Sequence, residues 1–201
     1  MWAINPYVYH SEMEIEGVVL TGGASRRMGQ DKSQLTIQGE VLSERIARTL
    51  SNRVGRVTIL GRKPISGFEF VADAGEYAGP LMALSRFRPK CDAVLVASCD
   101  LPLFDARLID IFLSHLLSHD AVLPEHDGKA QPLCALYKRS AWPLLEQTVA
   151  EGRKSVMAWI DRLSIRLVTQ DEIRDAGVDP NSIRGVNTPE ELQQLLTPRN
   201  Q

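Results

Sequence analysis

The chain has 201 residues, of which 44% are hydrophobic and 24% are charged, and its formal net charge is -2. This length favours one domain with a sizeable buried core, and so balanced a charge gives no support for a nucleic-acid or membrane partner. The three cysteines include no CxxC pair, so the composition predicts neither a disulfide framework nor a zinc site and fits a reducing cytoplasm. Residues 1–14 lack the basic start and apolar run of a secretory signal, and we expect a flexible extension ahead of a single domain, 15–201.

Apolar, β-branched runs alternate along the chain with stretches of helical periodicity. We expect strands at 16–20, 56–60, 68–72, 93–97, 120–123, 133–137 and 165–168. We expect helices at 41–50, 80–84, 105–117, 141–149, 155–163 and 188–196. The run at 93–97 is apolar on both faces, which is typical of a central parallel strand covered by helices on both sides. The alternation predicts an α/β fold, a three-layer α/β/α sandwich with a mainly parallel sheet.

A glycine-rich basic loop follows the first expected strand and reads LTGGASRRMGQDK over residues 20–32. Ligands of such sheets bind beyond the carboxyl ends of the strands, where this loop begins. The adjacent Gly22 and Gly23 let the backbone approach a ligand, and Arg27 and Lys32 supply positive charge for a triphosphate. The spacing fits neither a Walker A loop nor a dinucleotide-binding loop. The sequence therefore predicts a phosphate site of another kind, and the alternative is a solvated basic loop.

Polar side chains also follow the third and fourth expected strands and precede the last helix. Asp73 could accept hydrogen bonds from a base or ribose, and Gly79 and Pro80 then open a helix whose first turn favours anions. Asp100 ends the most apolar strand, where a carboxylate is costly unless it is paired or bound to a metal such as Mg²⁺. Asn187 could be a second oxygen ligand. The alternatives are a turn residue for Asp73, a helix cap for Asp100 and a helix-entry residue for Asn187.

Together these segments resemble one family, the molybdenum cofactor guanylyltransferases, over roughly residues 16–196. The loop of that family reads LxGGxSxRMGxDK, and the chain matches it at Leu20, Gly22, Gly23, Ser25, Arg27, Met28, Gly29, Asp31 and Lys32. Also in order are Asp73 with Gly79-Pro80-Leu81, Cys99-Asp100-x-Pro102, Gln131-Pro132 and the segment 186–192. Thr21 departs from the usual alanine, and we expect little effect because this position is expected to contact the nucleotide through its backbone. The Gly22-Gly23 pair and Asp31 favour the guanylyl over the related cytidylyl enzymes.

The resemblance implies a nucleotide-diphosphosugar-transferase-like fold and a reaction. The reaction joins GMP from GTP to the molybdenum–molybdopterin cofactor, forms its guanine dinucleotide form and releases pyrophosphate. GTP would be held by Leu20, Thr21, Gly22, Gly23, Lys32, Asp73, Gly79 and Asp100. Lys32, Arg27 and Asp100 would be catalytic through charge neutralisation, with Mg²⁺ held by Asp100 and Asn187.

The sequence also suggests residues for the acceptor side. Gln131 and Pro132 fall in the second half, where the acceptor should lie, and Arg153 and Lys154 either meet its phosphate or form a solvated basic turn. None of the histidines is a convincing general base, and an anionic nucleophile requires none. The competing functions are transfer of a cytidylyl or other nucleotidyl group, and GTP binding by a non-catalytic regulator of cofactor delivery, which would involve delivery proteins as partners.

Overall fold

The computed structural model describes residues 13–22, 36–37, 39–73 and 79–197. The main sheet has the strand order β10-β7-β9-β6-β1-β4-β5, with β8 paired to β7 alone. Its strands are β1 (Ile15–Leu20), β4 (Arg56–Gly61), β5 (Glu69–Ala72), β6 (Ala93–Ser98), β7 (Ala121–His126), β8 (Lys129–Ala130), β9 (Cys134–Lys138) and β10 (Ile165–Val168). A small hairpin of β2 (Thr36–Ile37) and β3 (Glu40–Val41) lies apart from this sheet. Every strand run expected from the sequence is therefore present.

The pairing is parallel throughout the main path except at β9, which is antiparallel to both β6 and β7. The direction of β9 follows from the turn before it. β7 ends at the carboxyl edge of the sheet, β8 folds back on it as a hairpin, and β9 then starts near that edge. The prediction of a mainly parallel sheet is confirmed.

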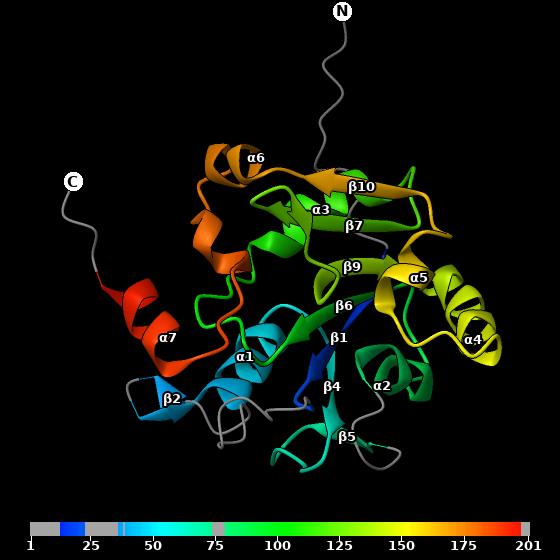
Figure 1. The fold of residues 1–201 in the computed structure, drawn as a ribbon, viewed down its shortest axis with the longest axis horizontal. Helices are drawn as coiled ribbons and strands as arrows, with labels where there is room; N and C mark the ends of the chain where they lie inside the picture. Colours follow the sequence, from blue (N-terminus) through cyan, green and yellow to red (C-terminus); the bar gives the residue numbers. More distant parts are fainter. Residues whose placement is uncertain (1–12, 23–35, 38, 74–78, 198–201) are drawn as a thin grey trace, which may run out of the picture.

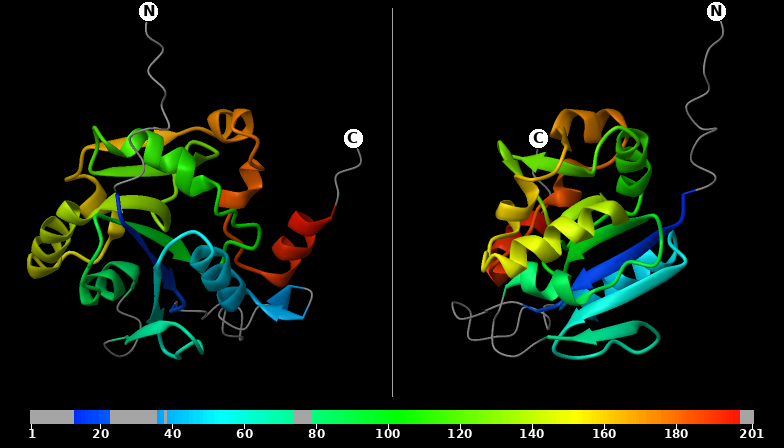
Figure 2. Two further views of the ribbon diagram at one scale, coloured as in Figure 1. Left: turned by 180° about the vertical axis from the view of Figure 1, so that it is seen from behind. Right: turned by 90° about the vertical axis from the view of Figure 1, so that its right-hand side faces the viewer.

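Helices cover both faces of the sheet (Figures 1 and 2). One face packs against α1 (Leu42–Ser51), α3 (Leu108–Leu116) and α6 (Gln170–Asp175), and the other packs against α2 (Pro80–Arg86), α4 (Trp142–Ala150) and α5 (Val156–Ile160). Alternate residues of β6 enter opposite cores, Leu95 on the first face and Val96 on the second, and both are fully buried. The expected three-layer sandwich is confirmed.

The sequence missed two elements between β10 and the last helix, α7 (Pro189–Leu196). These are α6 and the short 3-10 helix η3 (Pro180–Ile183). Helix α6 buries a single apolar residue, Ile173, so it has no periodic apolar stripe, and a capping box between Thr169 and Glu172 defines its start instead. No helix within the described ranges is long and apolar enough to cross a membrane.

The order of the strands places a topological switch point beside β1. The chain runs from β1 to β4 and β5 on one side and then returns to the other side of β1 for β6. At the carboxyl ends, Leu20 pairs with Ser98, and the N–H of Cys99 donates to the carbonyl of Leu20 at 2.9 Å. Ligands of parallel sheets bind at such a point, which is where three of the polar segments predicted from the sequence begin.

Candidate active site

The described first residues of two predicted loops, Thr21 and Gly22 in one and Asp73 in the other, meet at the ends of β1, β4 and β5. The N–H of Thr21 donates to the carbonyl of Leu60 at 2.8 Å, and the N–H of Asp73 donates to that of Gly61 at 2.9 Å. A Cβ atom placed on Gly22 would lie 2.5 Å from Oδ2 of Asp73. The carboxylate of Asp73 therefore lies against the α-carbon of Gly22, as convergence at the sheet edge predicts.

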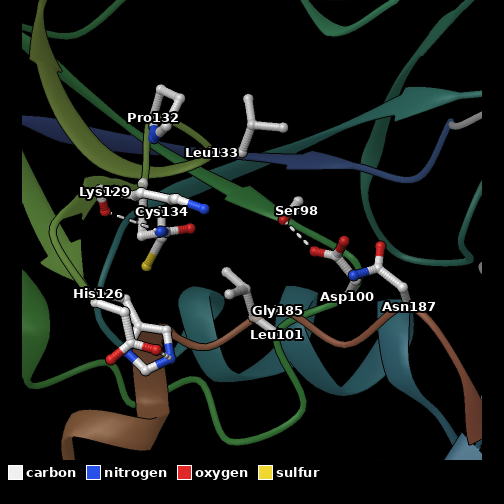
Figure 3. Close-up of a pocket in the computed structure, with 12 residues that line it drawn as sticks. Ser98, Asp100, Leu101, His126, Lys129, Pro132, Leu133, Cys134, Gly185 and Asn187 are labelled. Carbon is white, nitrogen blue, oxygen red and sulfur yellow. Dashed lines mark hydrogen bonds and ion pairs between the residues drawn. The ribbon is translucent and has the colours of Figure 1, made fainter. Parts of the chain in front are cut away.

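Asp100 follows β6, and its neighbours come from the segment ahead of α7. Oγ of Ser98 donates to Oδ1 of Asp100, and the backbone carbonyl of Asp100 accepts from the N–H of Val186 at 2.8 Å. A Cβ atom on Gly185 would lie 3.5 Å from that Oδ1. Figure 3 shows the amide of Asn187 beside the carboxylate of Asp100. Two oxygen-bearing side chains distant in sequence thus share one corner of the site.

A pocket of about 440 Å³ opens beside Asp100, on the side away from β4 and β5. Asp100 and Asn187 line one end, and the β7–β8 hairpin contributes His126 and Lys129 to the wall (Figure 3). Gln131 and the residues around the start of β9 complete the lining. The pocket thus combines two carboxylates, those of Asp100 and Asp127, with a primary amine and amides, a set of groups suited to a polar ligand.

Two polar atoms in the pocket wall are buried, Sγ of Cys134 and Nδ1 of His126. Burial, and after it the negative charge of Asp100, raise the pKa of the Cys134 thiol far above its usual range, so the thiol stays protonated and is no nucleophile. Nδ1 of His126 is buried and has no hydrogen-bond partner among the residues that the structure describes. An unsatisfied buried polar atom typically costs about 1–3 kcal/mol, which a polar partner at this ring would offset.

Of the residues predicted to bind GTP or metal, several fall in the described part of the chain. They are Leu20, Thr21, Gly22, Asp73, Gly79, Asp100 and Asn187. Gly79 precedes α2 with a φ of +86°, a conformation that favours glycine. Gly23, Arg27 and Lys32 lie outside the described residues, so their predicted roles stay predictions. The roles of the described residues in binding also stay predictions, although their positions at one edge are observed.

The structure separates the two acceptor suggestions made from the sequence. Gln131 and Pro132 line the pocket, whereas Arg153 and Lys154 are exposed between α4 and α5 and are not among its lining residues. For the basic pair, the solvated turn is the better interpretation.

Sequence reasoning missed the contribution of the β7–β8 hairpin. It found no convincing general base among the histidines, His126 included, and assigned nothing to Lys129. The signal was present, because Asp127 and Gly128 form an Asp-Gly pair, which favours a two-residue hairpin turn. Their φ angles are +49° and +73°, and His126 pairs with Lys129 across the turn. Residues paired across a hairpin lie on the same face of it, and both side chains line the pocket.

The described residues contain no cluster of three or more histidine, cysteine, aspartate or glutamate side chains that could hold a metal ion. An ion bound here would therefore take Asp100, with or without Asn187, and complete its coordination with water and ligand oxygens. Oxygen donors and retained waters are what Mg²⁺ prefers. The residues present thus fit a magnesium ion that arrives with a triphosphate.

Comparison with known proteins identifies the family. Residues 17–167 match the model of the MobA-like NTP transferase domain. A probable molybdenum cofactor guanylyltransferase of Bacillus subtilis is 30% identical, with 91% of this chain and 95% of that protein aligned, and the Desulfosudis oleivorans enzyme is 26% identical over 89% and 93%. Molybdopterin-guanine dinucleotide biosynthesis protein A of Archaeoglobus fulgidus has the same fold, with a TM-score of 0.75, 22% identity and coverage of 90% and 96%. The chain therefore belongs to the MobA-like NTP transferase family.

Proposed function

We propose that the protein transfers GMP from GTP to the molybdenum–molybdopterin cofactor and releases pyrophosphate. The observation that carries the proposal is the position of Asp100. On one side lie the ends of β1, β4 and β5, where Gly22 and Asp73 meet, and on the other lies the pocket formed with the β7–β8 hairpin. A nucleotidyltransferase needs two adjacent substrate sites and, between them, a group that can bind a metal ion to offset the charge of the phosphates. Asp100 occupies such a position at this edge of the sheet. The guanylyltransferase names of the curated relatives support the same reaction.

The nucleoside binds on the β1 side in this proposal. The backbone of Leu20 to Gly22 contacts it, and Asp73 accepts hydrogen bonds from the base or ribose. An ionised carboxylate only accepts hydrogen bonds and presents two oxygens. Guanine offers two adjacent donors, N1–H and the 2-amino group, whereas the corresponding edge of cytosine places an acceptor beside its amine. Asp73 therefore favours GTP over CTP if it faces the base.

The proposal includes a divalent ion, Mg²⁺, which Asp100 and Asn187 would hold together with oxygens of the triphosphate. When bound, such an ion neutralises charge on the triphosphate and orients the α-phosphate. Lys32 and Arg27 contribute further positive charge to the leaving pyrophosphate, and Gly23 and Gly79 belong to the backbone that surrounds the nucleotide.

The acceptor binds in the pocket beside Asp100. Lys129 meets the phosphate of the pterin, because it is the cationic side chain among the lining residues. Gln131 and the ring of His126 offer polar partners to the heterocycle. A phosphate oxygen of the acceptor attacks the α-phosphorus of GTP, the new P–O bond forms, and the bond from that phosphorus to the bridging oxygen of the pyrophosphate breaks. The nucleophile is already an anion, so the protein has to position it and offset its charge rather than remove a proton.

Pyrophosphate release on mixing the protein with GTP, Mg²⁺ and molybdopterin cofactor tests the proposal. We expect release that requires all three components and incorporation of GMP into the cofactor. CTP in place of GTP tests the cytidylyl alternative, since equal or faster release with CTP contradicts the assignment of guanine. GTP binding without pyrophosphate release instead indicates a regulator of cofactor delivery.

The cellular setting is also part of the proposal. The cysteines Cys91, Cys99 and Cys134 are free thiols, which fits a reducing cytoplasm. A cofactor that must reach a recipient enzyme is handed over by contact, so we include delivery proteins among the partners.

A further inference from the structure

The side chain of Thr21 is buried where β1 and β4 end, although the sequence suggested that only its backbone matters. Thr21 is 8% exposed. Its Oγ1 and its backbone N–H both donate to the carbonyl of Leu60, at 3.2 and 2.8 Å. Thr21, the second residue of the glycine-rich loop, is thus held by two hydrogen bonds to the neighbouring strand.

The hydroxyl of Thr21 occupies the space that any side chain on Gly61 would require. A Cβ atom on Gly61 would lie 2.0 Å from Oγ1 of Thr21, and it would lie 3.2 Å from both Cβ of Thr21 and the backbone nitrogen of Gly22. Contacts near 2 Å are not tolerated, so the two residues depend on each other. Threonine is accommodated at 21 because glycine is present at 61.

This pair connects directly to the groups that hold the nucleoside. The carbonyl of Gly61 accepts from the N–H of Asp73 at 2.9 Å, and the carboxylate of Asp73 lies against Gly22. A group added at Gly61 would press on Thr21 and on the nitrogen of Gly22 at once. It would therefore change the spacing between the backbone of Gly22 and the carboxylate of Asp73.

We propose that Thr21 and Gly61 are a matched pair that positions the nucleotide-binding backbone of residues 20–22 against Asp73. Thr21 is a positioning residue, because its hydroxyl is engaged with Leu60. The inference rests on the proposed function for its substrate, a guanine nucleotide. It adds that the geometry of the nucleoside site is set by a contact between the first two main strands of the chain.

Four proteins test the pair in a double-mutant cycle: wild type, Gly61→Ala, Thr21→Ala and the double variant. We expect Gly61→Ala to weaken GTP binding roughly tenfold to a hundredfold, as overpacking typically does. Removing the hydroxyl in the double variant leaves only the 3.2 Å contacts, so it should bind GTP more tightly than Gly61→Ala. Inorganic tripolyphosphate should bind all four alike, because only the nucleoside contacts move.

Gly55→Ala is the matched control, since a Cβ atom there meets no described atom within 4 Å. Unchanged GTP affinity in Gly61→Ala overturns the inference, and so does a double variant no better than Gly61→Ala. If Gly61→Ala does not fold, Thr21→Ser should bind GTP like wild type while Thr21→Ala binds roughly two- to tenfold more weakly, the effect of one hydrogen bond. Equal affinities of those two variants also overturn it.

Failure of the proposed function looks different. A wild type that binds GTP but releases no pyrophosphate contradicts the transferase and leaves the test of the pair intact; if the wild type binds no GTP, the unfolding free energies of the four proteins still reveal whether Thr21 and Gly61 are coupled. If the unfolding free energies are non-additive but no GTP binds, Thr21 and Gly61 are a steric pair, and the inference that the pair positions a nucleotide site is overturned.

Discussion

Replacing Asp100 by asparagine should remove most of the transferase activity without unfolding the protein. Asparagine has nearly the same shape, and its amide oxygen can still accept from Ser98. The hydrogen bond to a charged acceptor, worth about 1.5–3 kcal/mol, becomes a neutral one worth about 0.5–1.5 kcal/mol. The loss of about 1 kcal/mol is small beside the 5–15 kcal/mol of a typical domain. Removing one charge-stabilising contact costs about 10²–10³ in turnover, or about 2.7–4 kcal/mol of barrier.

The assay is pyrophosphate release under saturating GTP and cofactor, with urea unfolding measured on the same preparation. Asp105→Asn is the matched control, because Asp105 lies five residues along the chain, pairs with Arg107 and does not line the pocket. We expect the control to keep near-normal turnover. Normal turnover in Asp100→Asn, or equal losses in both variants, would refute the assignment of charge control to Asp100.

Three further changes probe other parts of the molecule. Gly22→Ala places a Cβ atom 2.5 Å from Oδ2 of Asp73, so it should weaken GTP binding about tenfold or more in an equilibrium titration; wild-type affinity contradicts the contact. Lys32→Ala should lower turnover about 10²–10³-fold and leave the unfolding free energy unchanged. Arg26→Ala, in the same sequence segment, is the control and should keep normal turnover. Glu172→Gln should lower the unfolding free energy at pH 7 by about 1 kcal/mol, because glutamine can keep the capping box but loses the charge that strengthens the hydrogen bonds from Thr169 and pairs with Arg166. Hydrogen bonds from Thr169 and the charge of Arg166 lower the pKa of Glu172 from 4.5, so this difference should be full above that value and vanish as the pH falls through the folded-state pKa; a pH-independent difference contradicts it.

The sequence predicted the centre of the sheet well because β1, β4 and β6 are buried on both faces. Continuous apolar runs such as 93–97 have few other interpretations, and the meeting of Asp73 and Asp100 at one edge follows from parallel pairing. The direction of β9 was not predictable in this way. An apolar run reads the same in either direction, and only the hairpin before it reverses the chain.

The contacts that shape the site were harder to predict than the elements that carry it. Thr21 and Gly61 are 40 residues apart, and no pattern in either segment predicts that their atoms compete for the same space. The pocket residues His126 and Lys129 lie in a polar stretch without periodicity, where composition says only that a loop is present. Such contacts depend on packing between distant segments, which periodicity and turn signals do not record.

The antiparallel course of β9 has a consequence for how the protein could change its acceptor. The nucleoside side is assembled from pieces far apart in the chain, around Gly22, Gly61 and Asp73, so a change in one must be matched in the others. Much of the pocket wall instead comes from one continuous stretch, 126–134, that leaves the sheet and re-enters it at the same edge. Such a continuous stretch can be replaced as one segment of sequence. The acceptor side of this protein could therefore be altered within that one stretch without changing the nucleotide side.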